Sequence, residues 1–228
     1  MTPKAPTSLP IPSECAHVAL FGGTFDPPHL AHVTLADLGR RELEGRVSAP
    51  VFLAFVPAAR SPHKDNAPTA TDAQRLDMLA LATEGLEHAG IWTDELDRAT
   101  HGEPSYWART LERAKSILPD RTLWFIIGAD QATSFHRWRT PREMLQFAQP
   151  TILPREPITS ATDLRAAMAN TDFWNEKELD HWAESFVDID SLPAASTEVR
   201  DAKGSPFETP LHPKVLAYAR QNALYGLS

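Results

Sequence analysis

Residues 18–32 read VALFGGTFDPPHLAH. Its apolar start is typical of a short buried strand, which Gly22 and Gly23 bring to an end. The two prolines that follow suit the first turn of a helix. We therefore expect His29 and His32 near a helix N-terminus, three residues apart on one face.

A strand end followed by a helix N-terminus favours the binding of an anion. Glycines let a ligand approach the backbone, and the unpaired N–H groups and dipole of the helix attract negative charge. Two imidazoles would add directional donors, so the stretch predicts a clamp for a phosphate chain. Two alternatives are a tight turn with histidines that only cap the helix, and a metal site, for which no third ligand is evident. The Gly-x-Gly-x-x-Gly pattern of dinucleotide-binding oxidoreductases is absent, which disfavours NAD as a cofactor.

Short apolar runs alternate with helical patterns along the rest of the chain. We expect strands over Val18–Phe21, Val51–Val56, Gly90–Thr93, Thr122–Ile127, Ala148–Leu153 and Ser185–Ile189. We expect helices over Leu30–Leu43, Ala73–Glu87, Tyr106–Leu118 and Pro141–Phe147. The alternation predicts an α/β fold with a Rossmann-like, doubly wound parallel sheet and flanking helices. Ligands of such sheets bind beyond the carboxyl ends of the strands.

The chain is expected to form a single domain over residues 17–228, with a small C-terminal helical part that begins at Pro213. The Pro-rich residues 1–16 predict a flexible tail. Residues 156–184 are polar and helix-compatible, and we interpret them as a peripheral helical insertion whose role the sequence leaves open.

Composition and charge limit the classes of partner that the protein is expected to bind. The 228 residues are 42% hydrophobic, enough for a sizeable core, and the formal net charge of -8 argues against nucleic acid as a partner. No apolar run approaches the length of a membrane span, so no membrane partner is expected. The single cysteine excludes an intramolecular disulfide and fits the cytoplasm. The sequence leaves the oligomeric state open, a homodimer included.

Further motifs follow the opening stretch in chain order. They are VPAARSPHK (56–64), LDRATHGEPSYWARTL (96–111), FIIGADQATSFHRW (125–138), ASTEVR (195–200) and LHPKVLAYARQNALYG (211–226). Together with GGTFDPPHLAH, they resemble the bacterial nicotinate-nucleotide adenylyltransferases, members of the nucleotidylyltransferase superfamily with its H-x-G-H signature. Two departures are Ala31, where the family usually has glycine, and Ala195, which replaces a serine. Both keep the expected donors, so they imply a shift in affinity more than a loss of activity.

The resemblance implies that the 5′-phosphate of nicotinate mononucleotide attacks the α-phosphorus of ATP and that pyrophosphate leaves. Because the nucleophile is already an anion, the enzyme needs in-line placement and charge stabilisation, not a strong base. The resemblance gives His29, His32 and Arg200 these catalytic roles. The implied ATP-binding residues are Gly22, Gly23, Thr24, Phe25, His29, His32, Gly128, Asp130, Ser196, Thr197 and Arg200. Mg²⁺ is expected to arrive with the ATP phosphates, without a dedicated protein ligand.

The resemblance also implies a site for the mononucleotide. Lys64, with His63, would reach its phosphate, and the Trp138 indole could stack on its pyridine ring. Backbone N–H groups near Trp107 would take the nicotinate carboxylate, which predicts preference for the acid over the amide. The full implied set is Asp26, His63, Lys64, Ser105, Tyr106, Trp107, Asp130 and Trp138.

Two other functions stay open on the sequence. One is a different nucleotidylyltransferase, such as a pantetheine-phosphate adenylyltransferase or a cytidylyltransferase. The other is a non-catalytic nucleotide sensor on the same scaffold, because a fold alone does not establish an activity.

Overall fold

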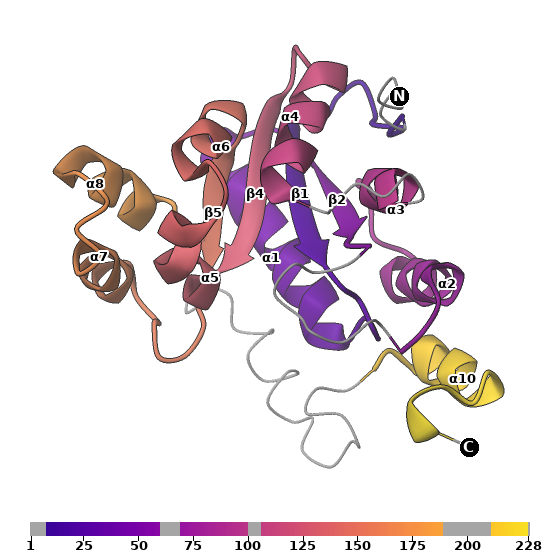
Figure 1. Ribbon diagram of the computed structural model, residues 1–228. Helices are drawn as coiled ribbons and strands as arrows, with labels where there is room; N and C mark the ends of the chain where they lie inside the picture. Colours follow the sequence, from indigo (N-terminus) through magenta and orange to yellow (C-terminus); the bar gives the residue numbers. More distant parts are fainter. Residues whose placement is uncertain (1–7, 60–68, 100–105, 189–210, 228) are drawn as a thin grey trace.

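A five-stranded parallel sheet forms the centre of the molecule. The computed structural model describes residues 8–59, 69–99, 106–188 and 211–227. The strand order is β3-β2-β1-β4-β5, and all neighbouring strands pair in parallel (Figure 1). The strands are β1 (His17–Gly23), β2 (Val51–Pro57), β3 (Ala89–Ile91), β4 (Thr122–Gly128) and β5 (Gln149–Leu153). Because the chain builds outward from β1 in both directions, the predicted doubly wound sheet is confirmed.

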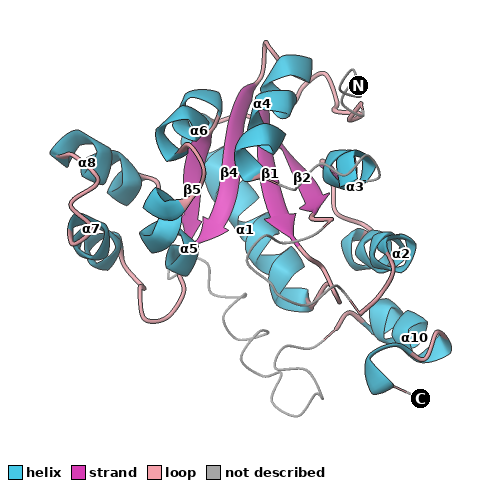
Figure 2. Ribbon diagram, in the orientation of Figure 1, coloured by secondary structure: helices cyan, strands magenta, loops and turns pink. Residues whose placement is uncertain are grey.

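Helices cover both faces of this sheet (Figure 2). One face packs on α1, α2 and α10, and the other packs on α4, α5 and α6 with α7 and α8 beyond them. The helices are α1 (Leu30–Val47), α2 (Asp72–Thr83), α3 (Asp94–Ala99), α4 (Trp107–Ile117), α5 (Ala129–Ser134), α6 (Pro141–Phe147), α7 (Ala161–Ala169), α8 (Glu176–Glu184) and α10 (Pro213–Gln221), with 3-10 turns η1 (Phe135–Arg137) and η3 (Leu224–Gly226).

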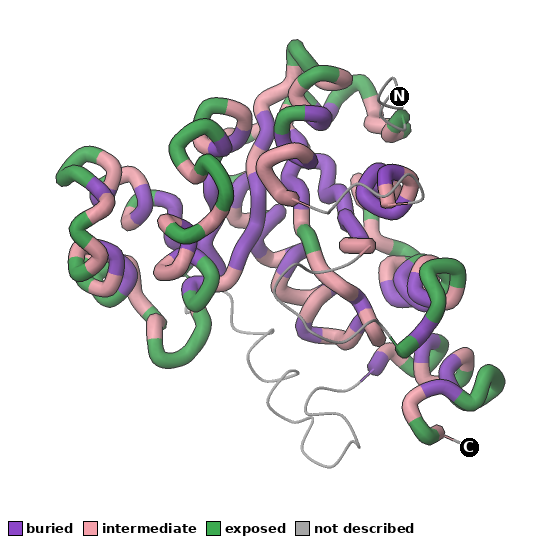
Figure 3. Tube along the Cα trace, viewed as in Figure 1, coloured by how far each residue is buried: buried purple, intermediate pink, exposed green. Residues whose placement is uncertain are grey.

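The strands are apolar because both of their faces are covered. Val18 and Leu20 of β1 belong to the core on the α4 side, whereas Ala19 between them belongs to the core on the α1 side. Every residue of β2 is buried, and the central strands are buried along most of their length (Figure 3). Double coverage explains why these strands read as continuous apolar runs and not as alternating ones.

Most predicted elements are confirmed, and one predicted strand is wrong. Five of the six expected strands and all four expected helices occur, and most of their ends are displaced by a few residues. The expected strand Ser185–Ile189 does not form within the described residues. Helix α8 continues to Glu184, so the chain reaches β5 only at Phe186, which makes a single parallel bridge to Ile152.

The segment 156–184 contains two helices, α7 and α8. Their apolar side chains Leu164, Met168, Leu179 and Trp182 are buried in the same core as Phe125 of β4. The polar composition of the segment therefore reflects its outer surface, while its inner side extends the core on the α4 side.

The chain before β1 also contacts the body of the protein. Leu9 and Ile11 pack against the core, and Cys15 is fully buried with a free thiol. The Arg121 guanidinium donates to the carbonyl oxygens of Pro12, at 3.3 Å, and of Cys15. These contacts fix residues 9–15 beside the start of β4.

The parallel register brings the carboxyl ends of β1, β2, β4 and β5 to one edge of the sheet. Gly23 at the end of β1 lies opposite Pro57 at the end of β2, and Gly128 at the end of β4 lies opposite Leu153 at the end of β5. The loops that follow these four strands therefore leave the sheet at the same edge, where ligands of doubly wound sheets bind.

Candidate functional site

The predicted pair of histidines lies at the start of α1. His29 is the N-cap, and its Nδ1 accepts from the backbone N–H of His32 at 3.2 Å. The Nδ1 of His32 accepts in turn from the backbone N–H of His29 at 3.3 Å. The two rings stack with centroids 3.4 Å apart and planes 15° apart. The histidines therefore cap the helix, as the alternative interpretation held, and also stand together at the sheet edge.

Because each Nδ1 accepts a hydrogen bond, each neutral ring carries its hydrogen on Nε2. Burial, together with the positive charge of Arg155, lowers the pKa of His29 from 6.5 to about 4. His29 is therefore neutral near pH 7. It can donate from Nε2 to a phosphate oxygen without first carrying a positive charge.

The two glycines of β1 accommodate the protein's own rings. A Cβ on Gly22 would lie 2.8 Å from Cζ3 of Trp107, and a Cβ on Gly23 would lie 2.9 Å from the Phe25 ring. The sequence had suggested that these glycines admit a ligand. The structure shows that the space of each missing Cβ is filled by an aromatic ring.

Phe25 and Trp107, both expected near substrates, are placed in different ways. The Phe25 side chain is 1% exposed and lies edge-on to the His32 ring, with centroids 5.4 Å apart. Only the backbone of Phe25 could therefore meet ATP. Trp107 begins α4 and is half-buried, and its Nε1–H has no partner among the described residues.

Asp26 makes contacts that the sequence did not indicate. Its carboxylate accepts hydrogen bonds from the backbone N–H groups of Thr69 and Ala70, at 2.6 and 3.0 Å, and from the hydroxyl of Tyr225, at 2.6 Å. Asp26 therefore holds the loop between β1 and α1 in place.

The ends of β4 and β5 bring a carboxylate and a guanidinium together. A Cβ on Gly128 would collide with Oδ1 of Asp130, so the glycine lets this carboxylate fold back over the end of the strand. Asp130 Oδ2 lies 3.6 Å from Nε of Arg155, and both side chains are about half exposed or more. Asp130, Arg155 and His29 thus share the carboxyl edge of the sheet.

Arg155 is the residue that the sequence reasoning missed. It follows β5 directly, after Leu153 and Pro154, so the rule applied to the other strand ends would have found it. Its backbone is fixed by a reciprocal pair of hydrogen bonds with Ile158, at 2.9 and 2.8 Å. The guanidinium is exposed enough to meet an anion and close enough to influence His29.

Tyr106 lies just before α4, and Trp138 lies just after η1. Trp138 is half-buried and packs against Phe135, with ring centroids 4.9 Å apart and planes 33° apart. The guanidinium of Arg139 lies over the Tyr106 ring, 4.9 Å from its centroid. This contact links the two segments that the sequence assigned to the nicotinate ring.

Several expected site residues lie outside the described residues. They are His63, Lys64, Ser105, Ser196, Thr197 and Arg200, together with the departure Ala195. Their roles stay predictions from the sequence.

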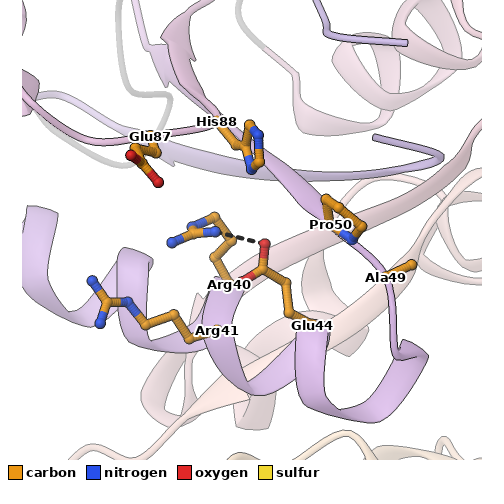
Figure 4. Close-up of a pocket in the computed structure, with 7 residues that line it drawn as sticks. All are labelled: Arg40, Arg41, Glu44, Ala49, Pro50, Glu87 and His88. Atoms are coloured by element: carbon orange, nitrogen blue, oxygen red, sulfur yellow. Dashed lines mark hydrogen bonds and ion pairs between the residues drawn. The ribbon is translucent and has the colours of Figure 1, made fainter. Parts of the chain in front are cut away.

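An open hollow of about 610 Å³ lies at the opposite end of α1, beside the starts of β2 and β3 (Figure 4). Its buried cation, Arg40, is already paired with Asp37 and Glu44, each at 2.7 Å. Arg41 also pairs with Asp37, at 2.8 Å. The hollow borders the amino ends of the strands, and its arginines already have carboxylate partners. We therefore do not regard it as the candidate active site.

Within the described ranges, no three His, Cys, Asp or Glu side chains gather closely enough to hold a metal ion. Among the helices of those same ranges, none is both long and apolar enough to cross a membrane.

The chain is similar to known proteins over most of its length. Residues 20–201 match the family model described as Cytidylyltransferase-like. The chain is 32% identical over 214 residues to a protein of Idiomarina loihiensis described as a probable nicotinate-nucleotide adenylyltransferase, covering 91% of this chain and 98% of that protein. A protein of Stenotrophomonas maltophilia with the same description is 32% identical over 219 residues, which is 90% of this chain and 95% of that protein.

A solved structure shares the fold. The Plasmodium falciparum nicotinic acid mononucleotide adenylyltransferase complexed with APC matches with a TM-score of 0.58 and 14% identity, over 93% of this chain and 98% of that chain. At this identity the likeness is one of fold, and it agrees with the parallel sheet described above.

Proposed function

Because this chain belongs to the cytidylyltransferase-like family, and within it to the nicotinate-nucleotide adenylyltransferases, we propose that it transfers the adenylyl group of ATP to nicotinate mononucleotide. The products are nicotinate adenine dinucleotide and pyrophosphate, so the reaction is a step of NAD biosynthesis. A phosphate oxygen of the mononucleotide forms a bond to the α-phosphorus of ATP. The bond from that phosphorus to the bridging oxygen of pyrophosphate breaks.

The observation that carries this proposal is the stacked pair of histidines at the N-terminus of α1. Their rings stand where the helix dipole already attracts anions, and the low pKa of His29 makes it a neutral N–H donor. His29 and His32 donate to the ATP phosphates and to the pyrophosphate as it leaves. Donors of this kind act on charge that grows in the transition state, and removal of one lowers turnover by about a hundredfold or more.

Arg155 supplies a cation for the same phosphates. Its guanidinium borders Asp130 and is close enough to His29 to lower that residue's pKa. A triphosphate would replace Asp130 as the partner of Arg155. Asp130 would then be released to accept a hydrogen bond from a ribose hydroxyl, the role that acids at strand ends play in nucleotide sites.

The mononucleotide lies, in this proposal, beside the start of α4. Trp138 offers an aromatic face to the pyridine ring, and backbone N–H groups near Tyr106 and Trp107 take its carboxylate. Lys64 and His63 reach its phosphate. Ser105, Ser196, Thr197 and Arg200 complete the two substrate sites, as the family motifs imply. Gly22, Gly23, Thr24 and Phe25 contribute backbone groups.

Asp26 is the residue whose expected role changes. Because its carboxylate already accepts three hydrogen bonds from the protein, we assign it to the loop and not to the mononucleotide.

We propose Mg²⁺ as the metal, carried by the phosphate oxygens of ATP. The protein offers few carboxylate ligands for this ion at the site, because Asp26 already accepts hydrogen bonds and Asp130 faces Arg155. This fits an ion that is bound mainly by ATP. Magnesium neutralises charge on the triphosphate and needs few protein ligands when phosphates supply oxygens. The lone cysteine, a buried free thiol, suits a reaction in the cytoplasm.

The test is a product analysis with ATP, Mg²⁺ and a panel of acceptors: nicotinate mononucleotide, nicotinamide mononucleotide, pantetheine phosphate and an alcohol phosphate with CTP. We expect pyrophosphate and nicotinate adenine dinucleotide from the first acceptor. His32→Ala should lower turnover by about a hundredfold or more while the protein remains folded. His181→Ala on α8 is the matched control and should keep parental turnover. Faster turnover of another acceptor would assign a different transferase, and nucleotide binding without turnover would assign a sensor.

A further inference from the structure

The carboxylate of Asp26 joins three segments that lie far apart in the sequence. Oδ1 accepts from the Tyr225 hydroxyl at 2.6 Å and from the Ala70 N–H at 3.0 Å, and Oδ2 accepts from the Thr69 N–H at 2.6 Å. A carboxylate offers about four acceptor positions, so most of this one is occupied. The loop after β1, the residues just before α2 and the C-terminal turn η3 therefore meet at one carboxylate.

The loop held by Asp26 is the one that presents the two histidines. On its other side, the buried Arg75 of α2 donates from Nη1 to the carbonyl oxygen of Thr24 at 2.5 Å. Between these anchors, the Phe25 ring is buried and contacts the His32 ring edge-on. The backbone from the end of β1 to the start of α1 is thus fixed from α2 and from the C-terminus.

The C-terminal helix delivers Tyr225 to this place. Helix α10 packs on α2, beside it in Figure 1, and buries Val215 and Ala219, while Leu224 is buried at the start of η3. Burial and the hydrogen bond to Asp26 raise the pKa of Tyr225, so its hydroxyl keeps the proton that it donates.

We propose that Tyr225 is a positioning residue for the adenylyl transfer proposed above: through Asp26 it fixes the loop that holds His29 and His32 against the triphosphate. The inference rests on that proposed function. Groups that stabilise a transition state must be held within about 0.5 Å of the productive position. A displacement of about 1 Å can lower a rate by about a hundredfold. A hydroxyl 199 residues along the chain from Asp26 therefore affects the reaction without touching a substrate.

The chain offers a matched control for this test. Tyr218 on α10 donates its hydroxyl to Asp77 of α2 at 2.7 Å, which is also a tyrosine–aspartate bond from the C-terminal part of the chain. It does not involve Asp26. Tyr225→Phe and Tyr218→Phe each delete one such hydroxyl.

We expect Tyr225→Phe to lower kcat by about tenfold or more, with a smaller change in the KM for either substrate. Tyr218→Phe should keep kcat within about twofold of the parent, and we expect both variants to unfold at similar temperatures. Asp26→Asn should lower kcat as well, and adding Tyr225→Phe to it should lower kcat little further, because both changes open the same contact. Equal kcat values for the two phenylalanine variants would overturn the proposal.

A second readout does not depend on turnover. The ring NMR signals of His29 and His32 should shift in Tyr225→Phe and stay in place in Tyr218→Phe. If the parent protein itself fails to turn over nicotinate mononucleotide, the proposed function fails. If the parent is active and these ring signals are unchanged in Tyr225→Phe, the positioning role fails.

Discussion

Gly22→Ala tests whether the glycine near the end of β1 is required by the protein's own Trp107 ring. The added Cβ would lie 2.8 Å from Cζ3 and 3.0 Å from Cη2 of that ring. Carbon atoms in contact ordinarily stay about 3.5–4.0 Å apart, so the ring must move by roughly 0.7 Å or more. The strand cannot move instead with ease, because Gly22 is paired with Val56 of β2.

Overpacking of this kind destabilises a protein by about 1–3 kcal/mol, and we expect Gly22→Ala to fall in that range. Because Trp107 is the first residue of α4, its displacement should also raise the KM for nicotinate mononucleotide. Gly45→Ala is the matched control. Gly45 lies inside α1, and an added Cβ there would have nothing within 4 Å, so this change should stabilise the protein by about 0.5–1 kcal/mol.

Urea unfolding of the parent and of both alanine variants measures these free energies. Gly22→Ala combined with Trp107→Phe should recover stability relative to the sum of the two single changes, since a smaller ring leaves room for the methyl group. If Gly22→Ala unfolds at the same urea concentration as the parent, Trp107 is not the reason for the glycine. The role of Gly22 would then return to the approach of a ligand.

Three further predictions rest on other contacts of the structure. Arg155→Gln should raise the pKa of His29 above about 4 but leave it below 6.5, because burial, the larger cause of the low pKa, remains. An NMR titration of the His29 ring measures this pKa. An unchanged pKa would show that Arg155 does not act on His29. Since that folded-state pKa lies below the unfolded value of 6.5, the unfolded chain takes up the proton first, so stability should fall as the pH drops from 6.5 to about 4. His29→Gln should remove this part of the pH dependence in urea unfolding at several pH values. The buried guanidinium groups of Arg98 and Arg113 share the carboxylate of Asp94. Asp94→Ala removes this carboxylate and should destabilise the fold by about 3–5 kcal/mol, measured by urea unfolding. A change of less than about 1 kcal/mol would contradict this prediction.

Much of the fold could be predicted from the sequence because its signals are local. The runs Val51–Val56 and Thr122–Ile127 are apolar throughout, as strands covered on both faces must be. Helix α6 begins at Pro141, a residue that suits the first turn, and the predicted helix matches it at both ends. The error over Ser185–Ile189 has the same origin. An apolar run shows that a segment is buried, but pairing with β5 depends on where α8 ends.

The site could be predicted only in part, because its contacts join distant segments. The spacing of His29 and His32 was local and placed both rings correctly at the start of α1. The hydrogen bond between Asp26 and Tyr225 spans 199 residues, and the packing of Trp107 on Gly22 joins α4 to β1. Neither has a pattern in the sequence that would reveal its partner. Arg155 was different, since its place after a strand was visible.

The neutral state of His29 follows from how the site is assembled, and it suits the role that we propose for this ring. The ring is partly buried and stands at a helix N-terminus near Arg155, and each of these features disfavours a positive charge on it. In the proposed function, the Nε2–H of the neutral ring is held in place, and its hydrogen bond strengthens as negative charge accumulates on the leaving phosphate. Stabilisation of the transition state in excess of the bound substrate is what accelerates a reaction, so in the proposed function the burial of His29 serves the chemistry as well as the fold.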